Sequence, residues 1–154
     1  MTRLLAAPLA LLLAAASPAG DRFMGTWRLD KVKSRIAVDP GVKSKEIVFA
    51  PAPGGGVITE TLEMKSGAGG RQVTRLRFVY GRFTPQSRPG IDSFAVNKEG
   101  ADRIYWTARL KGATVARLRV DLSADGRELT FRYLYSAADR TGKVTADRYV
   151  YDRR

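Results

Sequence analysis

The chain has 154 residues, no histidine, no cysteine and a formal net charge of +12. Without histidine or cysteine it cannot form a Ser-His-Asp or Cys-His catalytic group, a zinc site built on those ligands, or a disulfide. We therefore expect no metal and no cofactor, and we assign no catalytic residue. An enzyme that uses a carboxylate or tyrosines remains open on residue types alone.

The first nineteen residues have the pattern of a secretory signal. Arg3 is their only charge, an apolar run extends from Leu4 to Ala16, and small residues follow. The run is shorter than the roughly 20 apolar residues that a membrane span needs. We predict a cleavable signal peptide over 1–19, with cleavage after Ala16 or Ala19, and one domain over 20–154. With no cysteine to carry a lipid and no disulfide despite export, the composition favours a bacterial periplasmic or secreted protein.

Beyond the signal, apolar and polar residues alternate in short runs that are separated by glycine- and proline-rich turns. This pattern predicts about nine strands and no substantial helix. Residues 31–45 are expected to be irregular, and 81–90 a loop because it contains Pro85 and Pro89. The predicted strands cover residues 23–29, 46–50, 57–64, 72–80, 91–96, 103–110, 116–122, 129–135 and 144–151.

Many short strands with short connections are typical of an antiparallel sandwich or an up-and-down barrel. Closure removes the exposed edges that an open sheet of this size would present. We therefore predict an all-β fold, a single antiparallel up-and-down barrel of about 8–10 strands.

The alternation also predicts which side chains face the barrel axis. Glu60, between Ile58 and Leu62, is assigned to the inner face of its strand together with them. The inward aromatic residues either fill a packed core or surround a cavity for an apolar or amphipathic molecule. The residues expected to line such a cavity are Glu60, Leu62, Phe78, Trp106, Phe131, Tyr133 and Tyr135.

The opposite faces carry many arginines, in line with the net charge. They form either an ordinary solvated exterior or a surface that docks on an anionic membrane or polymer. No motif for a specific nucleic acid is present, and we expect a monomer. The predicted basic exterior consists of Arg75, Arg77, Arg103, Arg109, Arg117, Arg119 and Arg132.

The first strand, Phe23-Met24-Gly25-Thr26-Trp27-Arg28-Leu29, contains a Gly-x-Trp motif preceded by an aromatic residue. In this the chain resembles the calycins, the superfamily of lipocalins and fatty-acid-binding proteins. It looks most like exported bacterial lipocalin-like proteins whose role is unassigned, and its closing strand, Tyr149-Val150-Tyr151-Asp152-Arg153, is similar to theirs. The resemblance implies that Trp27 plugs one end of the barrel, with Gly25 beside it. It also implies an arginine across the indole; Arg148 and Arg153 are candidates, and Arg153 has the matching position.

The resemblance to the fatty-acid-binding branch is incomplete at the ligand site. There an Arg-x-Tyr pair of the last strand grips a carboxylate, whereas this chain has Tyr149 and Tyr151, with Arg148 on the opposite face. The segment between the first two strands is also too short for a two-helix lid. We expect a carrier of an apolar or amphipathic ligand, without that grip. The alternative is an envelope or interaction protein with a packed interior and a basic exterior.

Overall fold

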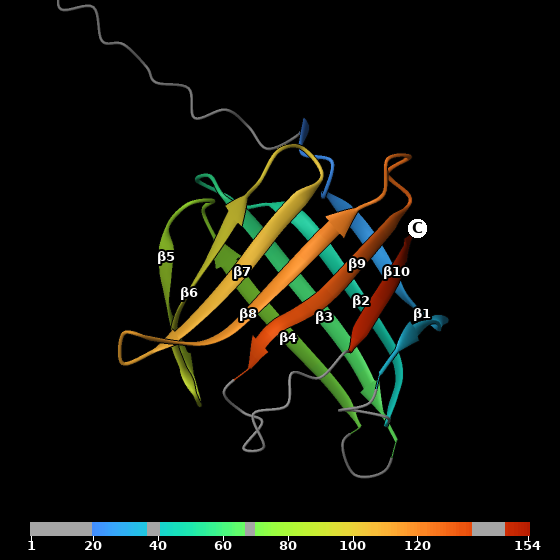
Figure 1. Ribbon diagram of the computed structural model, residues 1–154, viewed down its shortest axis with the longest axis horizontal. Helices are drawn as coiled ribbons and strands as arrows, with labels where there is room; N and C mark the ends of the chain where they lie inside the picture. Colours follow the sequence, from blue (N-terminus) through green and yellow to red (C-terminus); the bar gives the residue numbers. More distant parts are fainter. Residues whose placement is uncertain (1–19, 37–40, 67–69, 137–146) are drawn as a thin grey trace, which may run out of the picture.

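The computed structural model describes residues 20–36, 41–66, 70–136 and 147–154, without the side chains of Arg88, Tyr135 and Ser136. The predicted signal peptide, residues 1–19, lies outside these ranges. Ten strands wind around one axis (Figure 1). They are β1 (Gly25–Arg35), β2 (Val42–Pro51), β3 (Val57–Lys65), β4 (Arg71–Phe78), β5 (Phe83–Arg88), β6 (Ile91–Lys98), β7 (Arg103–Leu110), β8 (Ala113–Leu122), β9 (Glu128–Ser136) and β10 (Arg148–Arg153).

The strands form one antiparallel sheet in the order β4-β3-β2-β1-β10-β9-β8-β7-β6-β5. Every neighbour in the sheet is also a neighbour in sequence except β1 and β10, whose pairing joins the two ends of the chain. Among the described strands, β4 and β5 remain as the two edges, so the barrel is nearly closed. The predicted all-β, up-and-down barrel is confirmed.

Two regions that were predicted to be irregular contain strands. β1 continues to Arg35 across a break in register, and β2 begins at Val42. Within the predicted loop 81–90, β5 includes Pro85, which lies opposite Ser93 of β6. Proline lacks an N–H and is tolerated in an edge strand, and β5 is an edge strand. The prediction was wrong because the proline was taken to exclude a strand altogether.

One end of the barrel is sealed by the residues of the Gly-x-Trp motif. Trp27 is fully buried, and its indole N–H donates to the carbonyl of Phe23 at 2.9 Å. The guanidinium of Arg153 lies 4.2 Å from the centre of the indole ring. Gly25 has a φ of +130°, a conformation that favours glycine, and a Cβ there would also lie 2.8 Å from Nη1 of Arg153, so that guanidinium would have to shift.

Arg153 also ties this end of the barrel together by hydrogen bonds. It donates to the carbonyls of Met24 at 2.8 Å, Arg22 at 2.6 Å and Gly126 at 2.7 Å. A cation over an indole contributes about 0.5–2 kcal/mol. The predicted trio of Gly25, Trp27 and Arg153 is therefore brought into one contact, with Arg153 rather than Arg148 on the indole. We call this end the plug end.

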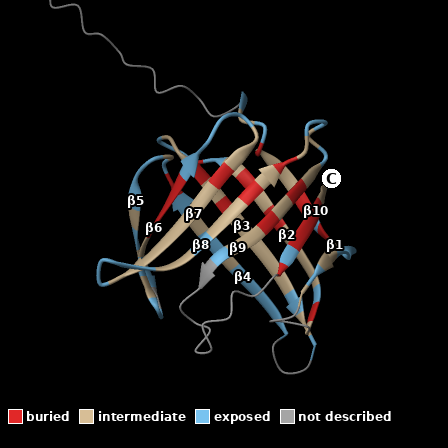
Figure 2. Cartoon of the chain, in the orientation of Figure 1, coloured by how far each residue is buried: buried red, intermediate tan, exposed pale blue. Residues whose placement is uncertain are grey.

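Burial is concentrated toward the plug end (Figure 2). The strands enter and leave this end at Gly25, Val57, Phe78 and Leu129, where the inward side chains are closely packed. The fully buried side chains of largest volume are Trp27, Tyr151, Phe23, Phe78, Ile104, Leu129, Val57, Val96, Val120 and Val150. At the opposite end, which we call the open end, the strand termini are mostly exposed or half-buried. Among the described residues, no helical segment has the length and hydrophobicity needed to cross a lipid bilayer.

Candidate functional site

A cavity of about 500 Å³ occupies the half of the barrel that lies toward the open end. This volume is in the range of small-molecule sites in proteins. Its wall draws on β2, β3 and β4 on one side and on β7 to β10 on the other. The described lining residues are Lys45, Ile47, Phe49, Thr59, Thr61, Glu63, Lys65, Gln72, Thr74, Leu76, Trp106, Leu118, Phe131, Tyr133, Tyr149 and Tyr151.

The predicted orientation of β3 is wrong. Thr59, Thr61 and Glu63 face the cavity, whereas Glu60 and Leu62 lie on the outer face. Glu60 instead pairs with Arg75 of β4 at 2.5 Å. The prediction placed the more apolar set of alternate residues inside, but this strand borders a cavity rather than a packed core, so its inward residues can be polar.

The remaining predicted lining residues divide between core and cavity. Trp106, Phe131 and Tyr133 lie at the cavity wall, while Phe78 is buried in the core below it. The side chain of Tyr135 lies outside the described part of the chain. Among the cavity residues that the sequence-based prediction missed are Lys45, Glu63 and Lys65. The signal for them was the alternation Thr59-x-Thr61-x-Glu63-x-Lys65, which is regular but polar.

Polarity rises from the floor of the cavity to its rim. The cross-strand register places Phe49 opposite Thr59, Ile47 opposite Thr61 and Lys45 opposite Glu63 along β2 and β3. On the neighbouring strand β4, the residues opposite Thr59, Thr61 and Glu63 are Leu76, Thr74 and Gln72. The floor is thus apolar, and charged and amide groups gather toward the open end, as an amphipathic ligand would require.

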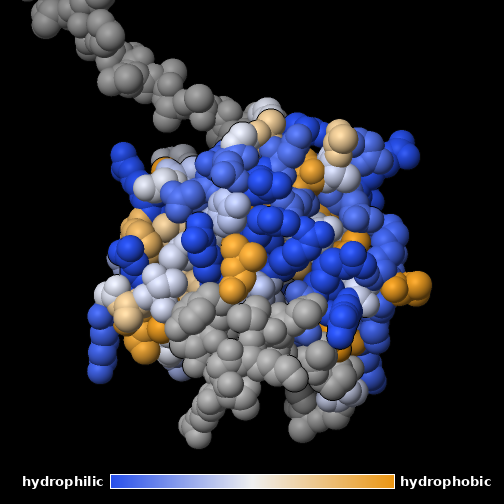
Figure 3. All heavy atoms as spheres, in the orientation of Figure 1, coloured by the Kyte–Doolittle hydropathy of each residue, from blue (hydrophilic) through white to orange (hydrophobic). Residues whose placement is uncertain are grey.

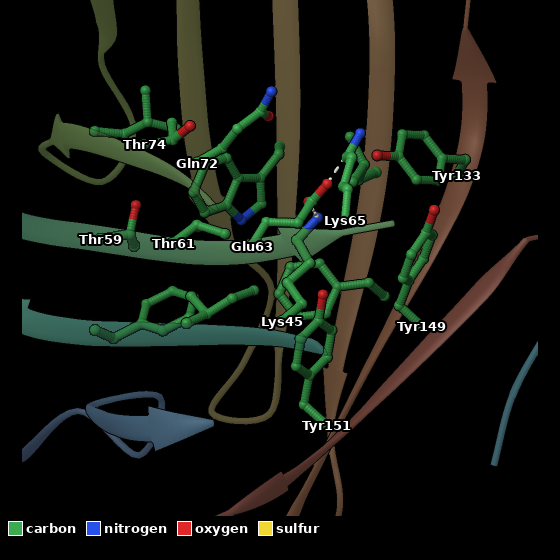
Figure 4. Close-up of a pocket in the computed structure, with 16 residues that line it drawn as sticks. Lys45, Thr59, Thr61, Glu63, Lys65, Gln72, Thr74, Tyr133, Tyr149 and Tyr151 are labelled. Carbon is green, nitrogen blue, oxygen red and sulfur yellow. Dashed lines mark ion pairs between the residues drawn. The ribbon is translucent and has the colours of Figure 1, made fainter. Parts of the chain in front are cut away.

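An ion-paired cluster at the rim consists of Lys45, Glu63 and Lys65 (Figure 4). The two oxygens of the Glu63 carboxylate are held separately. Nζ of Lys45 lies 2.9 Å from Oε2, and Nζ of Lys65 lies 3.0 Å from Oε1. Burial raises the pKa of Glu63, but the hydrogen bonds from the two lysines outweigh it, so the pKa lies below its ordinary value. Glu63 is therefore ionised inside the barrel.

Aromatic side chains with polar atoms complete the wall. The rings of Tyr133 and Tyr149 meet edge to face at 6.2 Å, and Nζ of Lys45 lies 5.5 Å from the centre of the Tyr149 ring. Burial, followed by the nearby charges of Asp147 and Glu63, raises the pKa of Tyr133, so its hydroxyl remains a neutral donor. The buried indole N–H of Trp106 has no hydrogen-bond acceptor among the described residues.

The last strand carries the tyrosines but no inward arginine. Tyr149 and Tyr151 line the cavity. Arg148 is exposed on the other face, where it donates to the carbonyl of Lys33 at 2.7 Å. The cations of the cavity thus come from β2 and β3 instead of from β10.

The arginines of the predicted basic exterior are largely engaged in local contacts. Asp121 accepts from three of them, Arg103 at 2.6 Å, Arg119 at 2.8 Å and Arg132 at 3.0 Å. The others are held by a carboxylate, by carbonyls or by rings: Arg75 by Glu60, Arg77 by Pro53 and Gly55, Arg109 by Phe83, and Arg117 by Tyr105. The described part of the face shown in Figure 3 is mainly hydrophilic, with scattered apolar spots. Docking on an anionic surface stays a prediction.

Comparison with solved structures shows which proteins share this fold. No family model and no curated protein matches the sequence. Among solved structures, a mutant of the fluorescent protein UnaG is similar, with a TM-score of 0.62 and 14% identity over 88% of this chain and 98% of that chain. The fatty-acid-binding protein 1 of Echinococcus granulosus has a TM-score of 0.58 and 14% identity, over 86% and 97% of the two chains.

The fold is one that a fatty-acid-binding protein shares. Secretory abundant heat soluble protein 4 of Ramazzottius varieornatus extends the likeness, with a TM-score of 0.53 and 13% identity over 88% of this chain and 96% of that chain. At these identities the shared feature is the fold, and the chemistry of the cavity depends on this chain's own residues.

Proposed function

We propose that this protein is an exported carrier that holds one small apolar or amphipathic molecule in the calycin barrel. The observation that carries the proposal is the cavity of about 500 Å³ with an apolar floor and a polar rim. A site with apolar walls and a few convergent polar groups is what a small ligand needs for affinity and orientation. One of the structural neighbours is a fatty-acid-binding protein by name, which supports the same class of function.

The alternative of an interaction protein with a solid interior is less well supported. It requires the inward aromatic residues to fill the barrel, yet Trp106, Phe131 and Tyr133 border open volume. It also requires a free basic exterior, while many of those arginines are paired with Asp121 or Glu60.

A titration with Nile red, a neutral fluorophore, tests the carrier proposal. The purified protein should bind it saturably with one site per chain. Thr74→Trp should abolish binding because Thr74 of β4 lines the cavity. Val73→Trp is the matched control, since Val73 is the neighbouring residue, is 48% exposed and lies on the outer face. Equal binding by the two variants, or no saturable binding by the wild type, would contradict the proposal.

The export part of the proposal rests on residues 1–19 and is tested separately. The full chain, produced in a Gram-negative host, should be found in the periplasmic fraction. Intact-mass measurement should give a chain that begins at Gly20 or Ser17, after cleavage following Ala19 or Ala16. A full-length chain in the cytoplasm would remove this part and leave the cavity argument intact.

A further inference from the structure

The rim of the cavity contains a carboxylate that belongs to the chain itself. The Glu63 carboxylate lies inside the barrel with its side chain 14% exposed, and each of its oxygens contacts a different ammonium group. Two positive groups that converge on one carboxylate form the arrangement that proteins use to hold the acidic group of a ligand. Here the carboxylate belongs to the chain itself.

Most of the polar groups in the cavity are hydrogen-bond donors, so they favour a ligand that carries acceptor atoms. Among the described lining residues, the charged ones are two lysines and one glutamate. Burial raises the pKa of the Tyr133 hydroxyl, which stays protonated and can donate to a ligand. An apolar body that carries an acidic group would satisfy these donors, whereas a cationic ligand would meet the two ammonium groups.

We propose that Lys45 and Lys65 form an anion subsite at the cavity rim, and that Glu63 is an internal counter-ion that the acidic group of an organic anion must displace. The inference rests on the proposed carrier function and names its ligand class. Displacement moves the Glu63 side chain toward the open end while the ligand's acid takes its place between the ammonium groups. Glu63 is then a specificity-determining residue that weakens the binding of anions, because its carboxylate and that of the ligand repel each other within the same cavity.

The subsite lies on a different wall from the last strand. β10 offers Tyr149 and Tyr151 to the cavity, and its Arg148 points outward to a backbone carbonyl. The cations come from β2 and β3, where Lys45 is directly opposite Glu63 in the register. The acidic group of the ligand is therefore expected at the rim, with its apolar body toward Phe131 and Leu118.

The test compares dodecanoate with dodecan-1-ol, which share an apolar chain and differ in charge. Calorimetric titration below their aggregation limits gives the affinity of each for wild type and variants. Glu63→Gln should raise the affinity for dodecanoate about tenfold and leave that for the alcohol unchanged, since it removes a repulsive charge. A Lys45→Met and Lys65→Met double variant should lower dodecanoate affinity about tenfold. Glu60→Gln, on the outer face of the same strand, is the matched control and should change neither affinity.

The gain of affinity in Glu63→Gln cannot result from poor folding, so the test remains decisive even if the double lysine variant is unstable. The inference is overturned if Glu63→Gln and Glu60→Gln behave alike, or if the alcohol gains as much as the acid. In that case binding of both molecules still leaves the carrier function standing. If neither molecule nor Nile red binds, the carrier function fails and the anion subsite fails with it.

Discussion

The plug end and the open end of this barrel are built from the same strands but contain opposite kinds of interior. At the plug end Phe23, Trp27 and Phe78 are at most 1% exposed, and the indole N–H of Trp27 has its acceptor. Toward the open end the interior is a cavity of about 500 Å³, and the indole N–H of Trp106 has no acceptor among the described residues. Packing, which stabilises the fold, and open volume bordered by polar groups, which suits a ligand, are therefore divided along the barrel axis.

The division can be followed along a single strand. The inward residues of β3 run from Val57 through Thr59 and Thr61 to Glu63. Toward the open end, an apolar group gives way to hydroxyl groups and then to a charge. Substitutions at the plug end should therefore change the free energy of unfolding, and substitutions at the rim should mainly change binding.

The largest effect is expected for Trp27→Ala. The substitution leaves a void at the sealed end and removes the ring on which the guanidinium of Arg153 lies. It also leaves the carbonyl of Phe23 without its hydrogen-bond donor. Truncation of a buried tryptophan costs about 3–5 kcal/mol of unfolding free energy. Urea unfolding followed by circular dichroism measures this loss. Trp106→Ala is the matched control toward the open end and should cost less, because that ring borders the cavity and has fewer packing contacts to lose. Similar losses for the two variants would erase the distinction between the ends.

Asp21→Asn is expected to have the next largest effect. The Asp21 side chain is 3% exposed; it accepts from the hydroxyl of Tyr80 at 2.7 Å and pairs with Lys98 at 2.9 Å. Burial and this hydrogen bond raise the pKa of Tyr80. Loss of the charged acceptor should cost about 1.5–3 kcal/mol in the same urea experiment. Asp102→Asn is the comparison, since the Asp102 pair with Arg22 is nearly half exposed and should matter by less than about 1 kcal/mol. An equal loss at both sites would show that burial of this network is unimportant.

The sequence predicted the plug end better than the open end, and the reason is physical. Alternation of apolar residues correctly placed Trp27, Phe78, Ile104 and Val120 inside, because a packed core selects apolar side chains. The Gly-x-Trp motif likewise located the sealed end, since the backbone of Gly25 has a φ of +130° that other residues adopt only with strain.

The open end could not be predicted by the same rule. On β3 the outer face carries Ile58, Leu62 and Met64, and the inner face carries threonines and charges. A rule that places apolar residues inside inverts such a strand, and with it the positions of Glu60 and Glu63. The ion pairs of Glu63 depend on which residues the register brings opposite one another, and that register follows from turn geometry and neighbouring strands.

A smaller effect is expected at the rim, and it depends on pH. The pKa of Glu63 is below its ordinary value of 4.5 in the folded protein, so the group stabilises the fold above that pH. The stabilisation is lost as the pH falls through the lower, folded-state value. Near neutral pH the wild type should be more stable than Glu63→Gln by about 1 kcal/mol, since the lysines are partly exposed. The difference should shrink steadily in acid, as measured by urea unfolding of both proteins across the pH range. A difference that is constant from neutral pH into acid would contradict the ion-paired rim.

The smallest effect is expected for Arg75→Ala on the barrel exterior. Arg75 pairs with Glu60 at 2.5 Å, but the two side chains are 74% and 40% exposed. Water screens such a pair, so the unfolding free energy should change by less than about 0.5–1 kcal/mol, and Nile red binding should not change at all. The substitution lies one residue from Thr74, whose side chain faces the cavity from the same strand. A marked change in binding would mean that the outer face of β4 takes part in the site. An unchanged affinity would instead confine the binding chemistry to the inward alternate residues.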